Sequence, residues 1–540
     1  MTSPENTLIT RAITVIIFFI TPSVIYAGLI TNFSFNLFTY EDYWKAYNEL
    51  AQSMLDGRLD VSMEAVGPEG QYYKDKVYMY YGILPALLRV LVSPFFDLNT
   101  VPLGNLSVWL MTTLAAASLQ YTLLLKNPAT INKQWNRHSV TLLLFYSTLI
   151  WFGSAYFIII MKGNLLHEPY AATLMVSSFF IAVVWKDIFL DRRNPNYRLV
   201  IYACLAALSL HTRQTVAISL YTSTVLLIFL ATTEKYKHQF GYKYHVWPYL
   251  RQLIITGYKP LIILGISGIA LLLLNYARFD EFWTLNGGDW GYTRADLKHT
   301  ATVCSRLLTD SPQFDFQRIL PNLHFYLFGN FPLHNEWIQN LGLGYVRKEW
   351  PFALLKFLWL GNLFIFSYFI ILIVKNTVTL GFKEMHDINL MTFSLSISTL
   401  LLLSYLTITF RYVADLWPLF MFAYLISFRH LIELQQNSLF RKYFNLITVL
   451  LILVLCVNLY RSWYVYSRYA TSSNLYEDGM PSNDILERLK NPPKSEWDIK
   501  KCIEEYDIKC SVSNTEKQQF SDCRFGRFRL RSQSQDFQPE

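Results

Sequence analysis

Long apolar segments recur along most of this chain and are separated by polar connections of varied length. A helix of about 20 apolar residues is long enough to cross the hydrocarbon core of a bilayer. On this criterion the pattern predicts about eleven membrane spans. They lie at residues 9–30, 104–125, 138–161, 166–185, 198–211, 214–232, 257–277, 352–374, 389–409, 412–428 and 443–460. We therefore expect an all-α polytopic membrane protein.

The apolar stretch at 198–232 leaves the number of spans open, because His211-Thr212-Arg213-Gln214 interrupts it. Each half holds only about 14–18 residues, which is short for a membrane span. The stretch therefore predicts either two short spans or one tilted helix. A single helix would move every later loop to the other side of the membrane.

The distribution of lysine and arginine favours two spans there. With the N-terminus in the cytoplasm, every predicted inner loop is basic, whereas the short outer connections at 161–165 and 410–411 hold one basic residue each. Basic loops tend to stay on the cytoplasmic side. The resulting topology has a transmembrane domain at 1–461, with long outer loops at 31–103 and 278–351. Residues 462–540 then form a small extracytoplasmic region, whose end we expect to be disordered.

The composition agrees with a membrane protein. Hydrophobic residues make up 53% of the chain and charged residues only 16%, and the mean hydropathy is +0.24. A soluble domain carries about 25% charged residues. The formal net charge of +8 is explained by the basic inner loops, so we expect no nucleic acid partner.

The cysteines divide between the spans and the outer regions. Cys204 and Cys456 lie in predicted spans, and four others lie in the outer loop and the C-terminal region: Cys304, Cys502, Cys510 and Cys523. An even number on the oxidising side fits two disulfides, one of which could tie the C-terminal region to the second outer loop. Free thiols are the alternative. No cysteine or histidine spacing is typical of a metal site.

The first outer loop opens with TYEDYWKAYNELAQSMLDGRLDV at 39–61. Its apolar residues recur at intervals of three and four, which predicts an interfacial helix closed by Asp56-Gly57. Glu41 and Asp42 lie at the start of that helix. An aspartate there caps the helix, serves catalysis, or does both. The apolar stripe holds Tyr43, Tyr47, Leu50, Ala51, Met54 and Leu55, and the polar face holds Lys45, Asn48, Glu49 and Gln52.

The segment at 70–96 places Lys74 and Lys76 before an apolar run that contains Pro85 and Pro94. The run is too broken for a span, and we interpret it as a second interfacial or re-entrant helix. Its lysines either meet an anionic lipid head or extend from the membrane edge into water.

Further charged residues lie at the predicted outer ends of spans, where charge is costly and function is the default hypothesis. Lys162, His167 and Glu168 flank one span. His167 and Glu168 could bind a divalent metal, relay protons or hold an acceptor, or could form a structural pair.

Two arginines complete this set. Arg213, next to His211, needs an anionic partner, either a phosphate or an internal carboxylate. Arg411 lies between two spans, and Asp415, one helical turn further, is its expected ion-pair partner.

These residues, taken in order, resemble the GT-C superfamily of membrane glycosyltransferases, most clearly the protein O-mannosyltransferases and lipid A aminoarabinose transferases. The stretch YNELAQSMLDGRL is similar to the family pattern Tyr-x-x-x-Ala-x-x-Met-Leu-x-x-Gly. The resemblance continues, over about residues 31–420, through QYYKDKVYMYYGILPALLRVLVSPFF, LLHEPYAATL, LHTRQT, NYARFDEFWTLNGGDWGY and FRYVADLWP.

The resemblance implies a GT-C-like fold and a glycosyltransferase that moves a sugar, with inversion, from a polyprenyl-phosphate donor to a lipid, glycan or protein acceptor on the outer face. A carboxylate of the first outer loop acts as base in that superfamily, which points to Asp42 or Glu41. Many relatives have Asp before Glu, whereas the order here is Glu-Asp; we favour Asp42. Substrate and phosphate binding then falls to Lys74, Lys76, Lys162, His167, Glu168, Arg213 and Arg411.

Cofactors, location and other functions stay open. The resemblance requires no cofactor, and a divalent metal is an open question. We favour a bacterial inner membrane, with the endoplasmic reticulum as the alternative. A transporter or lipid flippase would place charges at the midplane, in broken helices of paired halves. A non-catalytic cell-envelope assembly protein would use its outer C-terminal region to bind a partner.

Overall fold

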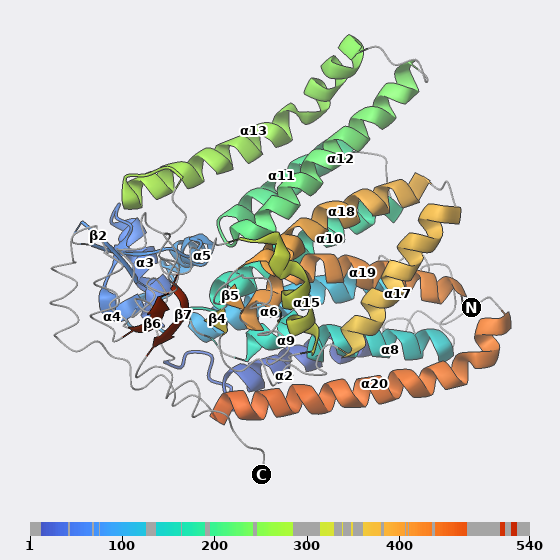
Figure 1. Cartoon of the computed structure of the whole chain (residues 1–540), viewed down its shortest axis with the longest axis horizontal. Coiled ribbons are helices and arrows are strands. Elements are labelled where there is room, and N and C mark those ends of the chain that lie inside the picture. Colours follow the sequence, from blue (N-terminus) through green and yellow to red (C-terminus); the bar gives the residue numbers. More distant parts are fainter. Residues whose placement is uncertain are drawn as a thin grey trace.

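The protein is a bundle of long helices with smaller elements gathered at one end, seen in a computed structural model of the whole chain (Figure 1). It is an all-α polytopic membrane protein, as predicted, apart from small sheets in its loops. The residues that the structure describes are 12–40, 44–66, 70–74, 76–125, 137–161, 163, 165–189, 195–240, 246–283, 314–328, 337, 347–348, 360–379, 383–405, 407–408, 410–434, 438–471, 508–512 and 520–525.

Each predicted span corresponds to a helix or to a pair of consecutive helices. Within the described residues, seven helices are long and apolar enough to cross a membrane, and two shorter apolar helices accompany them. The helices are η1 (Ile16–Ile20), α2 (Thr21–Ile30), α6 (Gly104–Leu125), α8 (Arg137–Phe152), α9 (Ala155–Ile160), α10 (Glu168–Phe189), α11 (Pro195–Leu210), α12 (Gln214–Phe240), α13 (Val246–Phe279), α17 (Leu360–Thr379), α18 (Lys383–Ser404), α19 (Val413–Leu434) and α20 (Ser438–Thr471).

The stretch at 198–232 forms two helices rather than one. Helices α11 and α12 pack side by side (Figure 1). The chain reverses between them over His211, Thr212 and Arg213, where Thr212 N and Arg213 N both donate to Ser209 O at 3.0 and 2.9 Å. The stretch therefore forms two helices, which agrees with the two-span interpretation.

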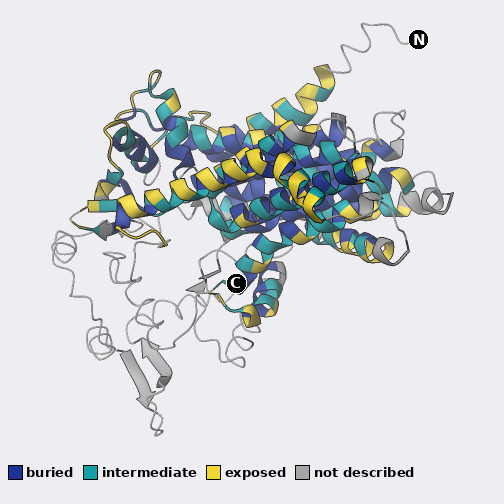
Figure 2. Ribbon diagram, turned by 90° about the horizontal axis from the view of Figure 1, so that it is seen from above, coloured by how far each residue is buried: buried dark blue, intermediate teal, exposed yellow. Residues whose placement is uncertain are grey.

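The centre of the bundle is formed by α6, α10 and α19, which pack against one another. Helix α19 is buried from Val413 to Phe428, and Trp185 and Trp417 lie fully inside. Helices α13 and α20 lie at the periphery and leave large apolar side chains uncovered (Figures 1 and 2), among them Trp247 at 82% exposure. Apolar side chains on the outer helices are what contact with lipid requires.

The first outer loop is a small unit of helices and a sheet, with an apolar core of its own. Its elements are α3 (Lys45–Leu55), β1 (Asp60–Val61), α4 (Met63–Val66), β2 (Gly70–Tyr73), β3 (Lys76–Met79) and α5 (Leu84–Val92). The strands are antiparallel in the order β1-β3-β2. Helix α3 ends as predicted, with Asp56 at its C-cap and Gly57 at a φ of +72°.

Two features of this loop differ from the prediction. The segment at 70–96 is helical only over α5, because its Tyr- and Val-rich first part pairs as a hairpin that turns at Lys74. Aromatic and β-branched residues favour such strands. Asn48 was expected on the polar face of α3, but it is buried, because its Nδ2 donates to Leu98 O at 2.9 Å and to Val101 O at 2.8 Å. These buried carbonyls need donors.

The other described elements are short. They are η4 (Phe316–Arg318), α15 (Ile319–Phe328), β4 (Arg347–Lys348), β5 (Thr407–Ile408), η6 (Phe410–Tyr412), β6 (Ile508–Val512) and β7 (Phe520–Phe525). Cys510 lies opposite Cys523 in the β6–β7 ladder. Cys304, Cys502 and most of the second outer loop lie outside the described residues, so the disulfide pairing stays a prediction.

Candidate functional site

The first outer loop packs onto one end of the bundle, which we call the loop end: residues 163, 165–168, 208–215, 275–280 and 410–415. Leu84 N, at the start of α5, donates to His211 O at 3.0 Å. Gly82 lies so close to the same turn that a Cβ there would be 2.3 Å from His211 O and 2.5 Å from Thr212 O. The loop therefore rests directly on the backbone that joins α11 to α12.

A buried ion pair joins the loop to the bundle. Arg89 of α5 donates from Nη1 to Glu168 Oε2 at 2.6 Å and from Nη2 to Glu168 Oε1 at 3.0 Å. Its Nε donates to Asn48 Oδ1 at 2.6 Å. Arg89 is 2% and Glu168 1% exposed. Glu168 is a candidate for metal or substrate binding, but both of its carboxylate oxygens accept hydrogen bonds from Arg89.

Arg213 also has an internal partner. Its Nε donates to Asp415 Oδ1, and Thr215 Oγ1 donates to the other oxygen at 2.8 Å. The guanidinium lies between the rings of Tyr170 and Tyr412, 4.5 and 4.6 Å from their centroids. The Arg213 side chain is still 22% exposed. Arg213 therefore has an internal carboxylate partner, Asp415, while part of its side chain stays accessible to solvent.

Arg411 lies in η6, next to Tyr412, and is half-buried. Asp415, the expected partner of Arg411, accepts hydrogen bonds from Arg213 and Thr215. The charges of Arg411 and Arg213 both act on Tyr170, so the two arginines share one neighbourhood. The structure thus brings together two of the predicted phosphate-binding cations.

Lys74 and Lys76 lie on the exposed hairpin and face carboxylates. Lys76 Nζ is 3.6 Å from Asp60 Oδ1, and Lys74 pairs with Asp280, which also accepts from Tyr73 Oη at 3.0 Å. The Lys74 hydrogen bond holds the pKa of Asp280 below its usual range. Exposed pairs of this kind contribute little energy. The Lys74 pair joins the hairpin to the end of α13, and the Lys76 pair joins it to β1.

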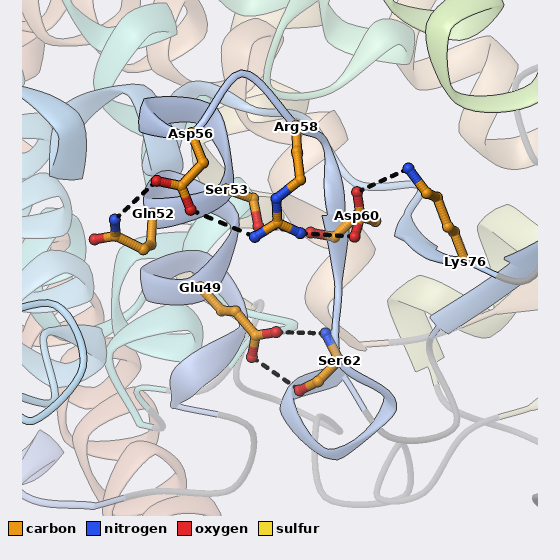
Figure 3. A network of polar contacts seen from close by, with 8 residues as sticks. All are labelled: Glu49, Gln52, Ser53, Asp56, Arg58, Asp60, Ser62 and Lys76. Carbon is orange, nitrogen blue, oxygen red and sulfur yellow. Dashed lines mark hydrogen bonds and ion pairs between the residues drawn. The ribbon is translucent and has the colours of Figure 1, made fainter.

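The carboxylates that follow the acidic pair serve the loop's own structure (Figure 3). Glu49 accepts from Ser62 N at 2.5 Å and from Ser62 Oγ at 2.8 Å. Arg58 joins Asp56 and Asp60 at 3.4 and 2.8 Å. These acids close α3 onto β1, which leaves Glu41 and Asp42 as the candidates for chemistry in this stretch.

Glu41, Asp42 and Lys162 lie outside the described residues, but their neighbours in the chain meet at the loop end. Asn105 Nδ2 donates to Thr39 Oγ1 at 2.7 Å, and Asn105 packs so tightly on Gly163 that a Cβ there would be 1.6 Å from Asn105 Oδ1. Trp44 contacts Tyr40, with ring centroids 5.0 Å apart. Asn105 therefore contacts Thr39, which precedes the acidic pair, and Gly163, which follows Lys162.

His167 is 1% exposed and lies beside Glu168 in the wall of the bundle. Across the described residues, no group of three or more His, Cys, Asp or Glu side chains is arranged to hold a metal ion. A divalent metal therefore stays an open prediction.

Two buried arginines at the contact between the first outer loop and the bundle were absent from the predicted set: Arg89 of α5 and Arg278 of α13. Both lie in apolar surroundings in the sequence, LPALLRVLV and NYARF. An arginine at a membrane edge needs an anion, and this holds for Arg89 and Arg278 as it does for Arg213. In the sequence pattern, Arg89 lies within a broken apolar run and Arg278 is the first residue after a predicted span.

Comparison with known proteins finds a likeness among solved structures alone. No family model matches the chain, and no curated protein matches it. Among solved structures, the crystal structure of the Archaeoglobus fulgidus oligosaccharyltransferase in the apo form is similar over 90% of this chain and 59% of that chain, with 14% identity and a TM-score of 0.43. A match with that score supports no conclusion about activity.

Gly82→Ala should destabilise the protein, because the new methyl group would meet two backbone oxygens that cannot move independently. Overpacking of this kind costs about 1–3 kcal/mol. The measurement is thermal unfolding in detergent followed by tryptophan fluorescence. Gly265→Ala is the control: nothing lies within 4 Å of its Cβ, and alanine favours a helix. Equal melting temperatures for both variants would contradict the close contact.

Arg89→Met and Glu168→Met should each destabilise the protein by about 3–5 kcal/mol, because each leaves one buried charge without its partner. The double variant should be more stable than either single variant, since it removes both charges. Denaturant titration in detergent measures all three. If the two losses simply add in the double variant, the side chains do not interact as the structure has it.

Proposed function

We propose that the protein is an integral membrane glycosyltransferase that moves a sugar from a polyprenyl-phosphate donor to a lipid, glycan or protein acceptor on the outer face. Asp42 is the preferred general base, with Glu41 as the alternative. Arg213 and Arg411 are the preferred cations for the leaving phosphate. The proposal also includes Lys162 as a third cation of this site.

The observation that carries the proposal is the convergence of the segments that resemble GT-C enzymes. Tyr47, Arg89, Glu168, Arg213 and Asp415 come from five of these segments. In the structure they form two buried polar clusters at one end of the bundle, linked through the contact of α5 with the α11–α12 turn. Buried charges are costly to assemble, so their concentration at one end favours a functional site there.

The chemistry needs only residue types found at this end. A carboxylate accepts the proton of the acceptor hydroxyl or amine as the acceptor atom attacks the anomeric carbon. The bond between that carbon and the phosphate oxygen breaks, and the phosphate leaves with the electron pair, so the configuration inverts. Fixed cations stabilise the charge that develops on the phosphate.

Some predicted site residues take a supporting role in this proposal. Glu168 is bound by Arg89, so we assign it to positioning the loop rather than to substrate. Lys74 and Lys76 hold the hairpin to neighbouring carboxylates. His167 is kept as a candidate for contact with the acceptor.

Asp42→Asn should lower transfer by about 100-fold or more, the usual contribution of a general base, and Glu41→Gln should have a smaller effect. The measurement is release of free polyprenyl phosphate, by mass spectrometry, from proteoliposomes supplied with a membrane lipid extract. Glu64→Gln is the control, since Glu64 is exposed and pairs only with Lys45 in its described surroundings.

Wild-type release by both acid variants would overturn the mechanism. Movement of a labelled lipid-linked sugar across the bilayer, with no release of polyprenyl phosphate, would favour a flippase instead. Full complementation of a deletion strain by Asp42→Asn would favour an assembly protein.

A further inference from the structure

Two of the cysteines that the sequence places outside the spans lie opposite each other in the C-terminal strand pair. Strands β6 and β7 are antiparallel, and Cys510 is the register partner of Cys523. Directly opposite residues of an antiparallel ladder have Cα atoms about 4.5 or 5.5 Å apart. Both distances lie within the range of about 4.4–6.8 Å that a disulfide bridges. The backbone therefore places the two cysteines at a suitable separation, whichever type of pair they form.

The register is regular up to and including this pair. Residues 508–510 pair in order with residues 525–523, and the irregularity in the ladder follows only after Ser511. Directly opposite residues share a face of the sheet, so Cys510 and Cys523 lie on the same face. A slip of one residue would move one cysteine to the other face. The observed register is thus the one that allows a bond between the two strands.

The sheet itself gives this strand pair little stability. Among the described residues, β6 and β7 pair only with each other, and an isolated two-stranded hairpin is at best marginally stable in water. Lys509 lies opposite Arg524, and like charges at opposite positions are destabilising. A covalent link is the usual means of stabilising a small element that lacks a sufficient core.

The cysteines of the bundle differ from this pair. Cys204 of α11 and Cys456 of α20 are free thiols in helices of the bundle. Residues 462–540 are instead predicted to lie on the outer side of the membrane, and disulfides form and persist in such oxidising surroundings. Register and predicted location therefore point to the same two residues.

We propose that Cys510 and Cys523 form a disulfide that closes the C-terminal hairpin. The bond forms by exchange with an oxidase that carries a protein disulfide. The Cys510 thiolate attacks that disulfide, which gives a mixed disulfide and releases one oxidase thiolate. The Cys523 thiolate then attacks the Cys510 sulfur, and the second oxidase thiolate leaves. Each cysteine thiol loses one proton, and the two electrons reduce the oxidase.

This pairing narrows the choice for the other outer cysteines. It leaves Cys304 and Cys502, which lie outside the described residues, for the second bond that the sequence predicts. The ring closed by the proposed bond, residues 510–523, is close in size to the loops of about 15 residues for which closure is strongly stabilising. The hairpin would then be held by its own bond, whether or not the C-terminal region is tied to the second outer loop.

The test is peptide mapping of the full chain, purified in detergent and alkylated with N-ethylmaleimide as it is unfolded. Trypsin cleaves between all four outer cysteines, and the two of the hairpin fall on peptides 510–517 and 518–524. Without reduction these two peptides should be recovered as one disulfide-linked species, which reduction separates. Cys204→Ser is the control and should give the same linked species, since Cys204 is a free thiol of the bundle.

Two results of the mapping would overturn the pairing. One is a bond from either hairpin peptide to peptide 299–306, which carries Cys304, or to peptide 502–509, which carries Cys502. The other is recovery of both hairpin peptides with N-ethylmaleimide attached before any reduction.

Reduction should open the hairpin, because it removes the constraint on the unfolded strands. Amide hydrogen exchange in β6 and β7 should become about 100-fold faster, the factor expected for losing a closed loop of this size. The double variant Cys510→Ser/Cys523→Ser should exchange fast without reduction and respond no further to it. Exchange in α3, whose sequence holds no cysteine, is the internal control. Exchange in β6 and β7 that reduction leaves unchanged would mean that no disulfide holds the hairpin.

These outcomes are separable from the proposed catalysis, since neither experiment needs a donor or an acceptor. Asp42→Asn should give the same linked peptides as the wild type, because it leaves the thiols unchanged. A linked hairpin in a protein that transfers no sugar would leave the disulfide standing and reject only the glycosyltransferase. Free thiols at Cys510 and Cys523 in an active wild type would reject only the disulfide.

Discussion

The buried pair of Arg89 and Glu168 is the interaction on which the loop end depends. It joins α5 of the first outer loop to the first residue of α10, a central helix of the bundle, through two hydrogen bonds of 2.6 and 3.0 Å. Asn48 completes the pair and at the same time binds the carbonyls of Leu98 and Val101. One charged pair thus sets the position of α3, of α5 and of the chain that leads into α6.

The arginines of the loop end divide by what they bind. Arg89 and Arg213 are matched by carboxylates of the bundle, and such pairs orient elements more than they add stability. In Arg278, at the end of α13, Nε and Nη2 are buried and have no hydrogen-bond partner among the described residues. The fold thus supplies an anion for Arg89 and for Arg213, whereas the described residues supply none for Arg278.

Much of the fold follows from the sequence, because lipid imposes a length and an apolar composition on each span. The apolar stripe of Tyr47, Leu50 and Ala51 likewise predicts α3 correctly. The tertiary pairs do not follow in the same way. Arg89 lies 79 positions from Glu168, and Asp415 has charged candidates both near in sequence and far away. Only the packing of α11, α12 and α19 shows that Arg213 is the partner of Asp415. Likewise, only the carbonyls of Leu98 and Val101 explain why Asn48 is buried.

The contact at Gly82 has an evolutionary consequence. Its neighbours are the backbone oxygens of His211 and Thr212, which every amino acid presents alike. Selection for this backbone contact therefore acts on position 82 only. A change of side chain at residue 212 needs no compensating change at residue 82. Among homologues we expect an invariant glycine that covaries with nothing, although it marks where the loop meets the bundle.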